Sequence, residues 1–261
     1  MEAKGYLEPQ TAVMFQRFLR SSYRIPGFLL MSFWRCMLLF RLRKKTQADR
    51  HALHQFYLDY IHRVHRLMGI EVIWEGGMPE GPSLLMGNHR SYVDAVLLPS
   101  RQPVVFVARS ESRNWPIIGW GATALDTIWV NRKDKNSRRE TRDQVKQRLQ
   151  NGYSIAIFPE GTTNKGPEVG PYRPSMFYIA HEGRFPITPV AIEYEDPDIA
   201  WVGNTWFIPH AWKQFGKKTI RVRVKFGETF IPDDPEQDRQ SMHDWASQET
   251  WAMREAFDNA P

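Results

Sequence analysis

Cysteine is almost missing from this sequence of 261 residues, in which Cys36 is the only one. A single cysteine excludes an intramolecular disulfide and any metal site made of several cysteine ligands. The sequence also lacks an uninterrupted run of the roughly 20 apolar residues that a membrane-spanning helix requires. Its most hydrophobic N-terminal stretch, residues 25–40, contains Arg35. The first residues do not show the basic, apolar and small-residue order of a secretory signal, so none is expected.

Positive charge and tryptophan, by contrast, are abundant. The formal net charge is +6, and the sequence contains 10 Trp. A basic protein favours an anionic partner, which could be nucleic acid, an anionic membrane surface or a phosphorylated substrate. Tryptophan is typical of the membrane interface. No nucleic-acid-binding motif is present, and the aromatic residues do not alternate with the basic runs in a stacking pattern, so we expect no nucleic acid.

The N-terminal 68 residues are predicted to form a helical, membrane-associating segment. Residues 25–40 are flanked by arginines on one side and by the basic run 41–45 on the other. This arrangement is typical of a helix that lies in the interface, with its basic residues on the headgroups of anionic lipids. The alternative is an amphipathic helix that covers the protein core. We expect a peripheral or monotopic protein at the cytoplasmic face of the inner or cell membrane, with residues 69–261 as the main domain.

A helix is also predicted over residues 47–68, where large apolar side chains recur at three- and four-residue steps. The histidines of this stretch alternate with arginines, and no pair of carboxylates completes a set of metal ligands. We interpret them as a solvated face and expect no metal site. They are His51, His54, His62 and His65.

From residue 70 onward, strand-like apolar runs alternate with helical segments. Several runs are continuous, as in strands that are buried on both faces. The alternation predicts an α/β fold with a mixed, largely parallel sheet flanked by helices and joined by right-handed crossovers. The strands are expected within residues 70–76, 82–88, 103–109, 126–132, 153–161, 187–195 and 219–230, and the helices at 91–98, near 115–121, and at 136–151, 173–182 and about 235–257.

The segment LLMGNHRSYVDAVLLPS, residues 84–100, places His89 and Asp94 in an apolar context. On one α-helix the two side chains would point about 140° apart. They can meet if His89 lies in the loop and the helix starts at Ser91, with Asp94 at the capping-box position. Asp94 could then accept a proton from one imidazole nitrogen and leave the other as a general base. The alternative is a helix cap with a histidine that fills a turn.

Two further strand ends carry polar side chains. FPEGTT, residues 158–163, follows one strand, and its Gly161 permits close backbone approach. DTIWVNR, residues 126–132, ends in Arg132, a candidate for phosphate recognition. In open α/β sheets, ligands bind at the carboxyl ends of the strands. The two segments are therefore expected to share a site.

NHRSYVD (88–94), DTIWVNR, FPEGTT and ITPVAI (187–192) together resemble the four motifs of a known family, in both order and spacing. The family is that of the lysophospholipid acyltransferases related to 1-acylglycerol-3-phosphate acyltransferase, and the resemblance covers roughly residues 70–195. It implies a glycerol-3-phosphate acyltransferase-like fold. It also implies transfer of an acyl group from acyl-CoA or acyl-carrier protein to the hydroxyl of a lysophospholipid. These thioesters are co-substrates, and no cofactor is expected.

The resemblance also assigns roles. His89 is the base that takes the proton of the acceptor hydroxyl, and Asp94 orients it. Other residues of the motifs are expected to hold the acyl acceptor and its phosphate. These candidate substrate-binding residues are Asn88, Arg132, Glu160, Gly161, Thr162 and Thr163.

The sequence departs from the family pattern at two positions. Thr163 and Asn164 stand where the third motif often continues with Arg-Ser, so a phosphate-contacting arginine is missing or is replaced by Lys165 or Arg173. Asn131 stands where the second motif commonly has an acidic residue. These departures leave room for another headgroup, such as that of a lyso-aminolipid. A non-catalytic lipid-binding protein and a hydrolase that uses water as the acceptor also stay open.

Two segments near the C-terminus have ambiguous patterns. Pro186 and Pro189 would sit awkwardly in the middle of a sheet, which indicates an edge strand, a bulge or a cavity wall. Residues 201–218 are rich in Trp and end in lysines. We expect either a loop that contacts lipid or an acyl chain, or a packed connection. His210 in this segment is interpreted as structural.

Overall fold

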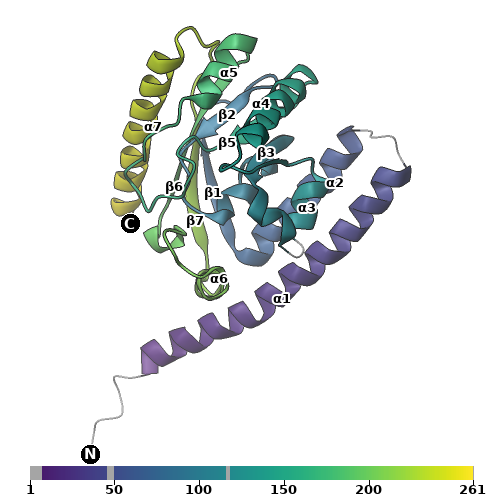
Figure 1. Cartoon of the computed structure of the whole chain (residues 1–261). Helices are drawn as coiled ribbons and strands as arrows, with labels where there is room; N and C mark the ends of the chain where they lie inside the picture. Colours follow the sequence, from purple (N-terminus) through teal and green to yellow (C-terminus); the bar gives the residue numbers. More distant parts are fainter. Residues whose placement is uncertain (1–7, 46–49, 116–117, 261) are drawn as a thin grey trace, which may run out of the picture.

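The computed structural model describes residues 8–45, 50–115 and 118–260. A seven-stranded sheet runs through it in the order β1-β7-β6-β2-β5-β3-β4 (Figure 1). Neighbouring strands are parallel except for β6 and β7. The prediction of a mixed, largely parallel sheet is therefore confirmed. The strands are β1 (Ile70–Glu75), β2 (Leu84–Gly87), β3 (Val104–Arg109), β4 (Ile128–Val130), β5 (Ser154–Ile157), β6 (Ile187–Tyr194) and β7 (Ile220–Phe226).

Helices cover both faces of the sheet (Figure 1). On one face, Val64 and Met68 of α2 enter a hydrophobic core with residues of β1, β6 and β7. On the other face, Leu149 of α4, Phe177 of α5 and Met242 of α7 share a second core. The predicted helices are thus present within a few residues of their expected ends. They are α2 (Arg50–Met68), α3 (Ile118–Ala124), α4 (Lys135–Gln150), α5 (Ser175–Gly183) and α7 (Pro235–Asp258).

The helix predicted at 91–98 is wrong in type. The structure has two short 3₁₀ helices there, Tyr92–Val96 and Leu98–Ser100. Pro99 has no N–H with which to continue an α-helical ladder, and 3₁₀ turns are the usual form of such short connectors. The predicted start is confirmed, because Ser91 has an extended backbone and directly precedes the first turn.

Pro189 lies inside the sheet, because β6 is bonded to β7 on one side and to β2 on the other. The edge-strand alternative is therefore wrong. The structure agrees with the second alternative, a bulge, which lies where β6 faces the segment after β7. Ile187 exchanges two backbone hydrogen bonds with Phe230, whereas Val190 pairs with Phe226. The segment after β7 thus contains one residue more than the stretch of β6 that it faces. The missing N–H of Pro189 falls in this distorted part of the ladder.

The N-terminal helix α1 (Glu8–Lys45) has 38 residues and continues through Pro26. Its inner side contacts α2, α3 and α6, and its Phe28 and Met31 pack against the core. The alternative of a core-covering helix therefore holds for this side, whereas the outer side is exposed. Among the helices of the described residues, none combines the length and the hydropathy that crossing a membrane would need. Association of α1 with a membrane surface stays a prediction.

Residues 201–218 contain a helix that the sequence pattern did not indicate, α6 (Phe207–Phe215). Its Pro209 lies in the first turn, where a backbone N–H has no partner within the helix. His210, Ala211 and Gln214 are buried on one side of α6, whereas Ile208 on the other side is exposed. The segment is therefore packed on its inner side, as the packed-connection alternative predicts. Its outer side is exposed, as the lipid-contacting alternative requires.

Candidate active site

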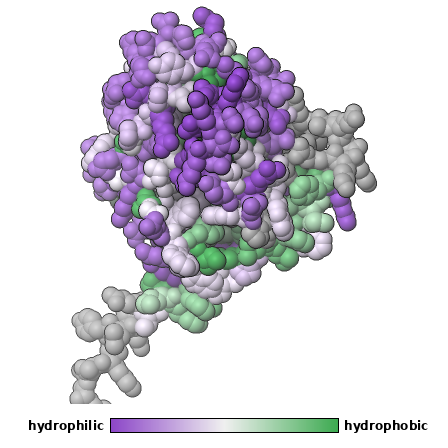
Figure 2. Space-filling view, viewed as in Figure 1, coloured by the Kyte–Doolittle hydropathy of each residue, from purple (hydrophilic) through white to green (hydrophobic). Residues whose placement is uncertain are grey.

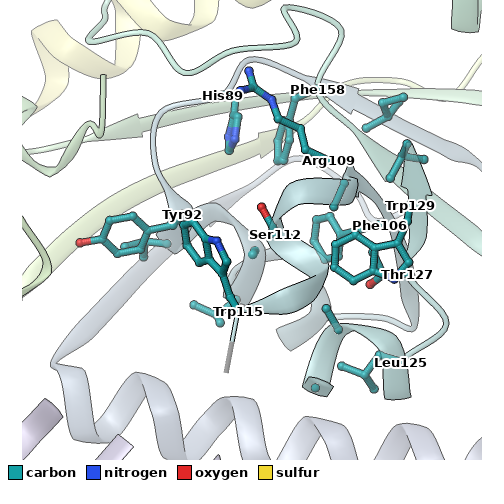
Figure 3. A pocket seen from close by; sticks show the side chains of 18 of the residues that line it. His89, Tyr92, Phe106, Arg109, Ser112, Trp115, Leu125, Thr127, Trp129 and Phe158 are labelled. Carbon is teal, nitrogen blue, oxygen red and sulfur yellow. The ribbon is translucent and has the colours of Figure 1, made fainter. Parts of the chain in front are cut away.

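The polar ends of four strands come together at one edge of the sheet. β2, β5, β3 and β4 are consecutive and parallel, so their carboxyl ends lie on the same side. His89 follows β2, Phe158 follows β5, Arg109 ends β3, and Arg132 follows β4. Figure 3 shows three of these side chains, those of His89, Phe158 and Arg109, gathered at one end of a cavity. The expected meeting of the motifs is thus what the structure shows.

His89 and Asp94 are in direct contact, with 2.7 Å between Nδ1 and Oδ2. Oδ2 also accepts the backbone N–H groups of Arg90 and Ser91, over 2.8 and 3.0 Å. Because these groups can only donate, Oδ2 is an acceptor, and Nδ1 of His89 must carry the proton of their bond. Nε2 is then left as an acceptor, which is the form that a general base requires.

The two side chains of the pair differ in exposure. The Asp94 side chain is fully buried, whereas 25% of the His89 side chain is exposed. The imidazole stacks on the ring of Phe158, with the centroids 4.1 Å apart and the planes almost parallel. Asp94 is thus withdrawn from solvent while the imidazole faces the cavity, as an orienting group and a working base would be placed.

Tyr194 is the fourth donor to Asp94, and sequence reasoning missed it. Its hydroxyl donates to Oδ1 over 2.6 Å from the last residue of β6. Burial raises the pKa of Tyr194 well above its ordinary value, so the phenol stays a donor. Tyr194 lies 100 residues from Asp94 in the chain, and only the pairing of β6 with β2 brings the two together. The sequence indicated Tyr194 only by its position at the end of the predicted strand that contains the fourth motif.

Replacing Tyr194 with phenylalanine should lower kcat about tenfold and destabilise the fold by about 1–3 kcal/mol, because Oδ1 of a buried carboxylate would lose a donor. Acyl transfer rates and chemical denaturation would measure the two effects. Tyr92→Phe is the matched control, since its hydroxyl bonds to His210 rather than to Asp94. An unchanged kcat in the Tyr194 variant would show that this hydrogen bond does not support the pair.

Glu160 and Asn88 lie beside His89 but bond to backbone groups. Glu160 accepts the N–H groups of His89 and Gly170, over 2.7 and 2.8 Å. Burial raises the pKa of the Glu160 carboxyl, although these two bonds act in the opposite direction. The Asn88 amide exchanges two hydrogen bonds of 2.8 Å with the backbone of Ile192. In this geometry both side chains hold the loops around His89 in place, and neither lines the cavity.

The cavity in front of His89 has a volume of about 890 Å³. Figure 3 shows His89 and Arg109 at one end and Leu125 and Thr127 at the other. Between them the walls are mainly apolar and come from the sheet, from α1 and α2, and from the segment around α6. The apolar lining includes Phe28, Leu39, Val64, Phe106, Trp115, Trp129, Phe158, Phe207 and Phe215. The cavity therefore has the form of a pocket for a long apolar group with a polar end.

Three arginines, Arg109, Arg132 and Arg173, form the polar end of the cavity and are termed the arginine cluster. Arg109 and Arg132 both donate to the carbonyl of Gly161. Gly161 has a φ of +71°, in which any other residue would be strained, and a Cβ there would lie 2.9 Å from Nε of Arg173. Burial, followed by the charges of Arg109 and Arg173, lowers the pKa of Arg132 to about 10, which still leaves it charged at neutral pH. This concentration of positive charge suits an anionic group.

The remaining motif residues are placed as follows. Thr162 is exposed and lines the cavity, and Thr163 also lines it while donating its hydroxyl to the carbonyl of Trp201. Of the two proposed replacements for the missing arginine, Arg173 lies in the arginine cluster. Lys165 instead pairs with Asp198, over 3.7 Å. Arg109, which the sequence analysis did not single out, was marked only by its position at the end of a predicted strand.

Of the histidines whose side chains the structure describes, only His89 lines the cavity. His62 is exposed, but His65 is partly buried and its Nε2 bonds to the carbonyl of Val96, so the expected solvated face is only partly correct. His210 bonds to the Tyr92 hydroxyl and to a backbone carbonyl. The side chains of His51 and His54 lie outside the described part of the structure. Among the described residues, no group of three or more potential ligands could hold a metal ion.

Comparisons with known proteins agree with the motifs. The acyltransferase family model matches residues 60–193. A lyso-ornithine lipid O-acyltransferase of Brucella abortus is 32% identical over 190 residues, which cover 65% of this chain and 71% of that protein. A 1-acyl-sn-glycerol-3-phosphate acyltransferase of Neisseria meningitidis is 27% identical over 158 residues, which cover 57% and 61%.

A solved structure supports the fold. The crystal structure of the 1-acyl-sn-glycerophosphate (LPA) acyltransferase PlsC from Thermotoga maritima matches with a TM-score of 0.69 and 22% identity. The match covers 93% of this chain and 98% of that one. The expected glycerol-3-phosphate acyltransferase-like fold is therefore confirmed. The family model, the relatives and the four motifs together show that the chain belongs to the acyltransferase family.

Proposed function

We propose that this protein transfers a fatty acyl group from the thioester of acyl-CoA or acyl-carrier protein to the free hydroxyl of a lysolipid with an anionic headgroup. One observation carries the proposal. The His89–Asp94 pair opens into a cavity that has the arginine cluster at one end and apolar walls along the rest. Such a cavity matches a molecule with an anionic head, a nearby hydroxyl and a long chain.

The geometry supports a simple chemical sequence. Nε2 of His89 takes the proton of the acceptor hydroxyl as its oxygen attacks the thioester carbonyl. Asp94 stabilises the imidazolium that forms, because its carboxylate is held by two backbone N–H groups and Tyr194. Collapse of the tetrahedral intermediate breaks the carbon–sulfur bond. The proton on His89 then passes to the leaving thiolate, which restores the neutral base.

The headgroup is the point on which the relatives differ. Proteins named for lyso-ornithine lipid and for 1-acyl-sn-glycerol-3-phosphate are both similar to this chain. The departure at Thr163 leaves room for a headgroup other than the usual phosphate, and a lyso-aminolipid is the first alternative. Arg173, in contrast, supplies a cation at the polar end of the cavity and suits a phosphate as well. For either headgroup, we propose that an anionic group of the acceptor binds to the three arginines that surround Gly161.

The reaction would take place at a membrane, where a lysolipid resides. The exposed apolar side of α1, which carries Phe15, Leu30 and Trp34, supports peripheral association with an anionic bilayer. The basic balance of the chain agrees with this. We propose the cytoplasmic face of the inner or cell membrane as its site, with acyl-CoA or acyl-carrier protein arriving from solution.

A panel assay tests the proposal. Purified protein would be given 1-acylglycerol-3-phosphate, lyso-ornithine lipid or lysophosphatidylcholine in vesicles, each with acyl-CoA and with acyl-carrier protein. Mass spectrometry should detect a diacyl product for at least one anionic acceptor. Free fatty acid without a diacyl product would indicate a hydrolase. Binding to the vesicles without any turnover would indicate a lipid-binding protein.

Replacing Arg173 with alanine should raise the KM for the anionic acceptor by about 10- to 100-fold, because a charge-assisted hydrogen bond contributes about 1.5–3 kcal/mol. The KM for the acyl donor should change much less. Arg173→Lys keeps the charge and should recover part of the affinity. Lys165→Ala is the matched control, because Lys165 pairs with Asp198 outside the arginine cluster. Equal effects of Arg173→Ala and Lys165→Ala would contradict the assignment of the headgroup site.

A further inference from the structure

The outer faces of α1 and α6 form one continuous apolar surface. On α6 and the residue before it, Trp206 and Ile208 are 81% and 76% exposed. The ring of Trp212 lies 5.7 Å from that of Phe18 on α1, which joins the two faces. In Figure 2 hydrophobic residues gather along the lower edge, where Figure 1 places α1 and α6, while the body above is mainly hydrophilic. Between Phe18 and Phe40, the exposed residues of α1 are all apolar or aromatic: Phe18, Leu19, Tyr23, Pro26, Leu29, Leu30, Phe33, Trp34, Met37, Leu38 and Phe40.

Buried polar contacts fix α6 against α1. The guanidinium group of Arg24 on α1 donates to the carbonyls of Phe215, Lys217 and Lys218 at the C-terminal end of α6, over 3.1, 2.6 and 3.1 Å. The Ser21 hydroxyl donates to the carbonyl of Trp212 over 2.6 Å. Arg24 and Ser21 are themselves buried. The two helices therefore present their outer faces as one rigid unit.

The charge of this unit is predominantly positive. Residues 9–48 and 199–227 contain no aspartate and no glutamate, although the chain has 29 of them. The same ranges contain many basic residues, among them the exposed Arg17, Lys213 and Lys218. Some of these cations pair with carboxylates of neighbouring segments, as Arg35 does with Asp59 and Lys213 with Asp198, so the surroundings of the apolar face are predominantly basic. Such a face matches the interface of an anionic bilayer, where aromatic rings lie at headgroup depth and basic side chains contact phosphates.

The inner face of α6 belongs to the cavity. Phe207 and Phe215 line it, and their rings lie 4.9 and 6.0 Å from that of Tyr92. Tyr92 is two residues before Asp94 in the chain. One short helix thus separates the cavity from the apolar surface, with its aromatic residues divided between the two sides.

We propose that α6 is a second membrane contact, inserted with α1 into the interface of an anionic bilayer, so that the cavity wall formed by Phe207 and Phe215 lies at the bilayer surface. The lipid acceptor would then enter the cavity beside α6. The entry of the acceptor rests on the proposed function. The insertion of α6 rests only on the exposed face, the charge and the contacts with α1.

The test compares the double variant W206S/I208S with Trp251→Ser, which removes an exposed tryptophan from α7. Binding would be measured by co-sedimentation with vesicles of phosphatidylethanolamine and phosphatidylglycerol. The partition coefficient of W206S/I208S should fall about tenfold or more, since each large apolar side chain lost from the interface weakens binding. Trp251→Ser should bind like the wild type. Equal binding of W206S/I208S and the wild type would overturn the proposal.

Acyl transfer provides a second readout. W206S/I208S should lose activity toward an acceptor embedded in vesicles and keep it toward a short-chain, water-soluble acceptor, because neither residue lines the cavity. Equal losses toward both acceptors would contradict entry beside α6. If the wild type binds vesicles through Trp206 and Ile208 but acylates no acceptor, the proposed function fails and the membrane contact stands.

Should the double variant not fold, a labelled cysteine gives the answer. Ile208→Cys would carry an environment-sensitive fluorophore, and the native Cys36 is buried, so labelling favours the new thiol. Addition of the same vesicles should shift its emission to the blue. A label at Trp251→Cys should show no shift. An unshifted label at position 208 would overturn the proposal.

Discussion

Replacing His89 with alanine is expected to lower kcat for acyl transfer by about 10³-fold or more. Nε2 of His89 is the acceptor nitrogen that faces the cavity, and without it no positioned group remains to take the proton of the acceptor hydroxyl. The neighbouring Arg132 cannot replace it, because a pKa of about 10 leaves this guanidinium group charged at neutral pH. The rate would be measured with saturating donor and acceptor.

The control for this variant is His62→Ala, which removes an exposed histidine of α2 and should keep full activity. Chemical denaturation should show a modest loss of stability for His89→Ala, about 1–3 kcal/mol, because Asp94 keeps its three other donors. A folded His89→Ala protein with a kcat near that of the wild type would refute the assignment of the base.

The fold could be predicted from the sequence where local pattern and tertiary environment agree. β2 and β5 are buried on both faces, and such strands appear in a sequence as continuous apolar runs. The long helices α4 and α7 have regular apolar positions that face the core. α6 escaped prediction because its nine residues are too few to show a clear period, and Pro209 within them indicates a loop.

The site was predictable in part, because parallel strands end at one edge of the sheet. That rule brings His89, Arg132 and the loop at Gly161 together from three distant stretches. It does not say where a side chain points. Glu160 and Asn88 are expected to bind the acceptor, and in the structure their polar atoms bond to backbone groups. Their contact with the acceptor stays a prediction.

Contacts that depend on pairing across the sheet could not be found in the sequence. Tyr194 reaches Asp94 only because β6 lies beside β2. Arg173 reaches the arginine cluster from the loop before α5, far from the second motif in the chain. Tyr194 stands at no spacing that a local pattern could show. Arg173 was one of two candidates for the missing arginine, and the structure was needed to choose it over Lys165, which pairs with Asp198.

Replacing Asp94 with asparagine separates the charge of this residue from its geometry. Oδ2 accepts three hydrogen bonds, two of them from the backbone N–H groups of Arg90 and Ser91. An asparagine would place its carbonyl oxygen there, since its NH₂ group cannot face two N–H donors. Its NH₂ group would then face Tyr194, whose hydroxyl oxygen can accept. The proton on Nδ1 of His89 and the orientation of the ring would thus be kept.

The kcat of Asp94→Asn should nevertheless fall by about 10²- to 10⁴-fold, because the imidazolium that forms during proton transfer would lose its buried counter-charge. The KM values for both substrates should change little, since Asp94 contacts neither the cavity nor the arginine cluster. Asp94→Ala, which removes both charge and hydrogen bonds, should be at least as inactive and clearly less stable to denaturant. If Asp94→Asn kept most of the wild-type kcat, the role of Asp94 would be the hydrogen-bonded turn alone, and catalysis would not depend on its charge.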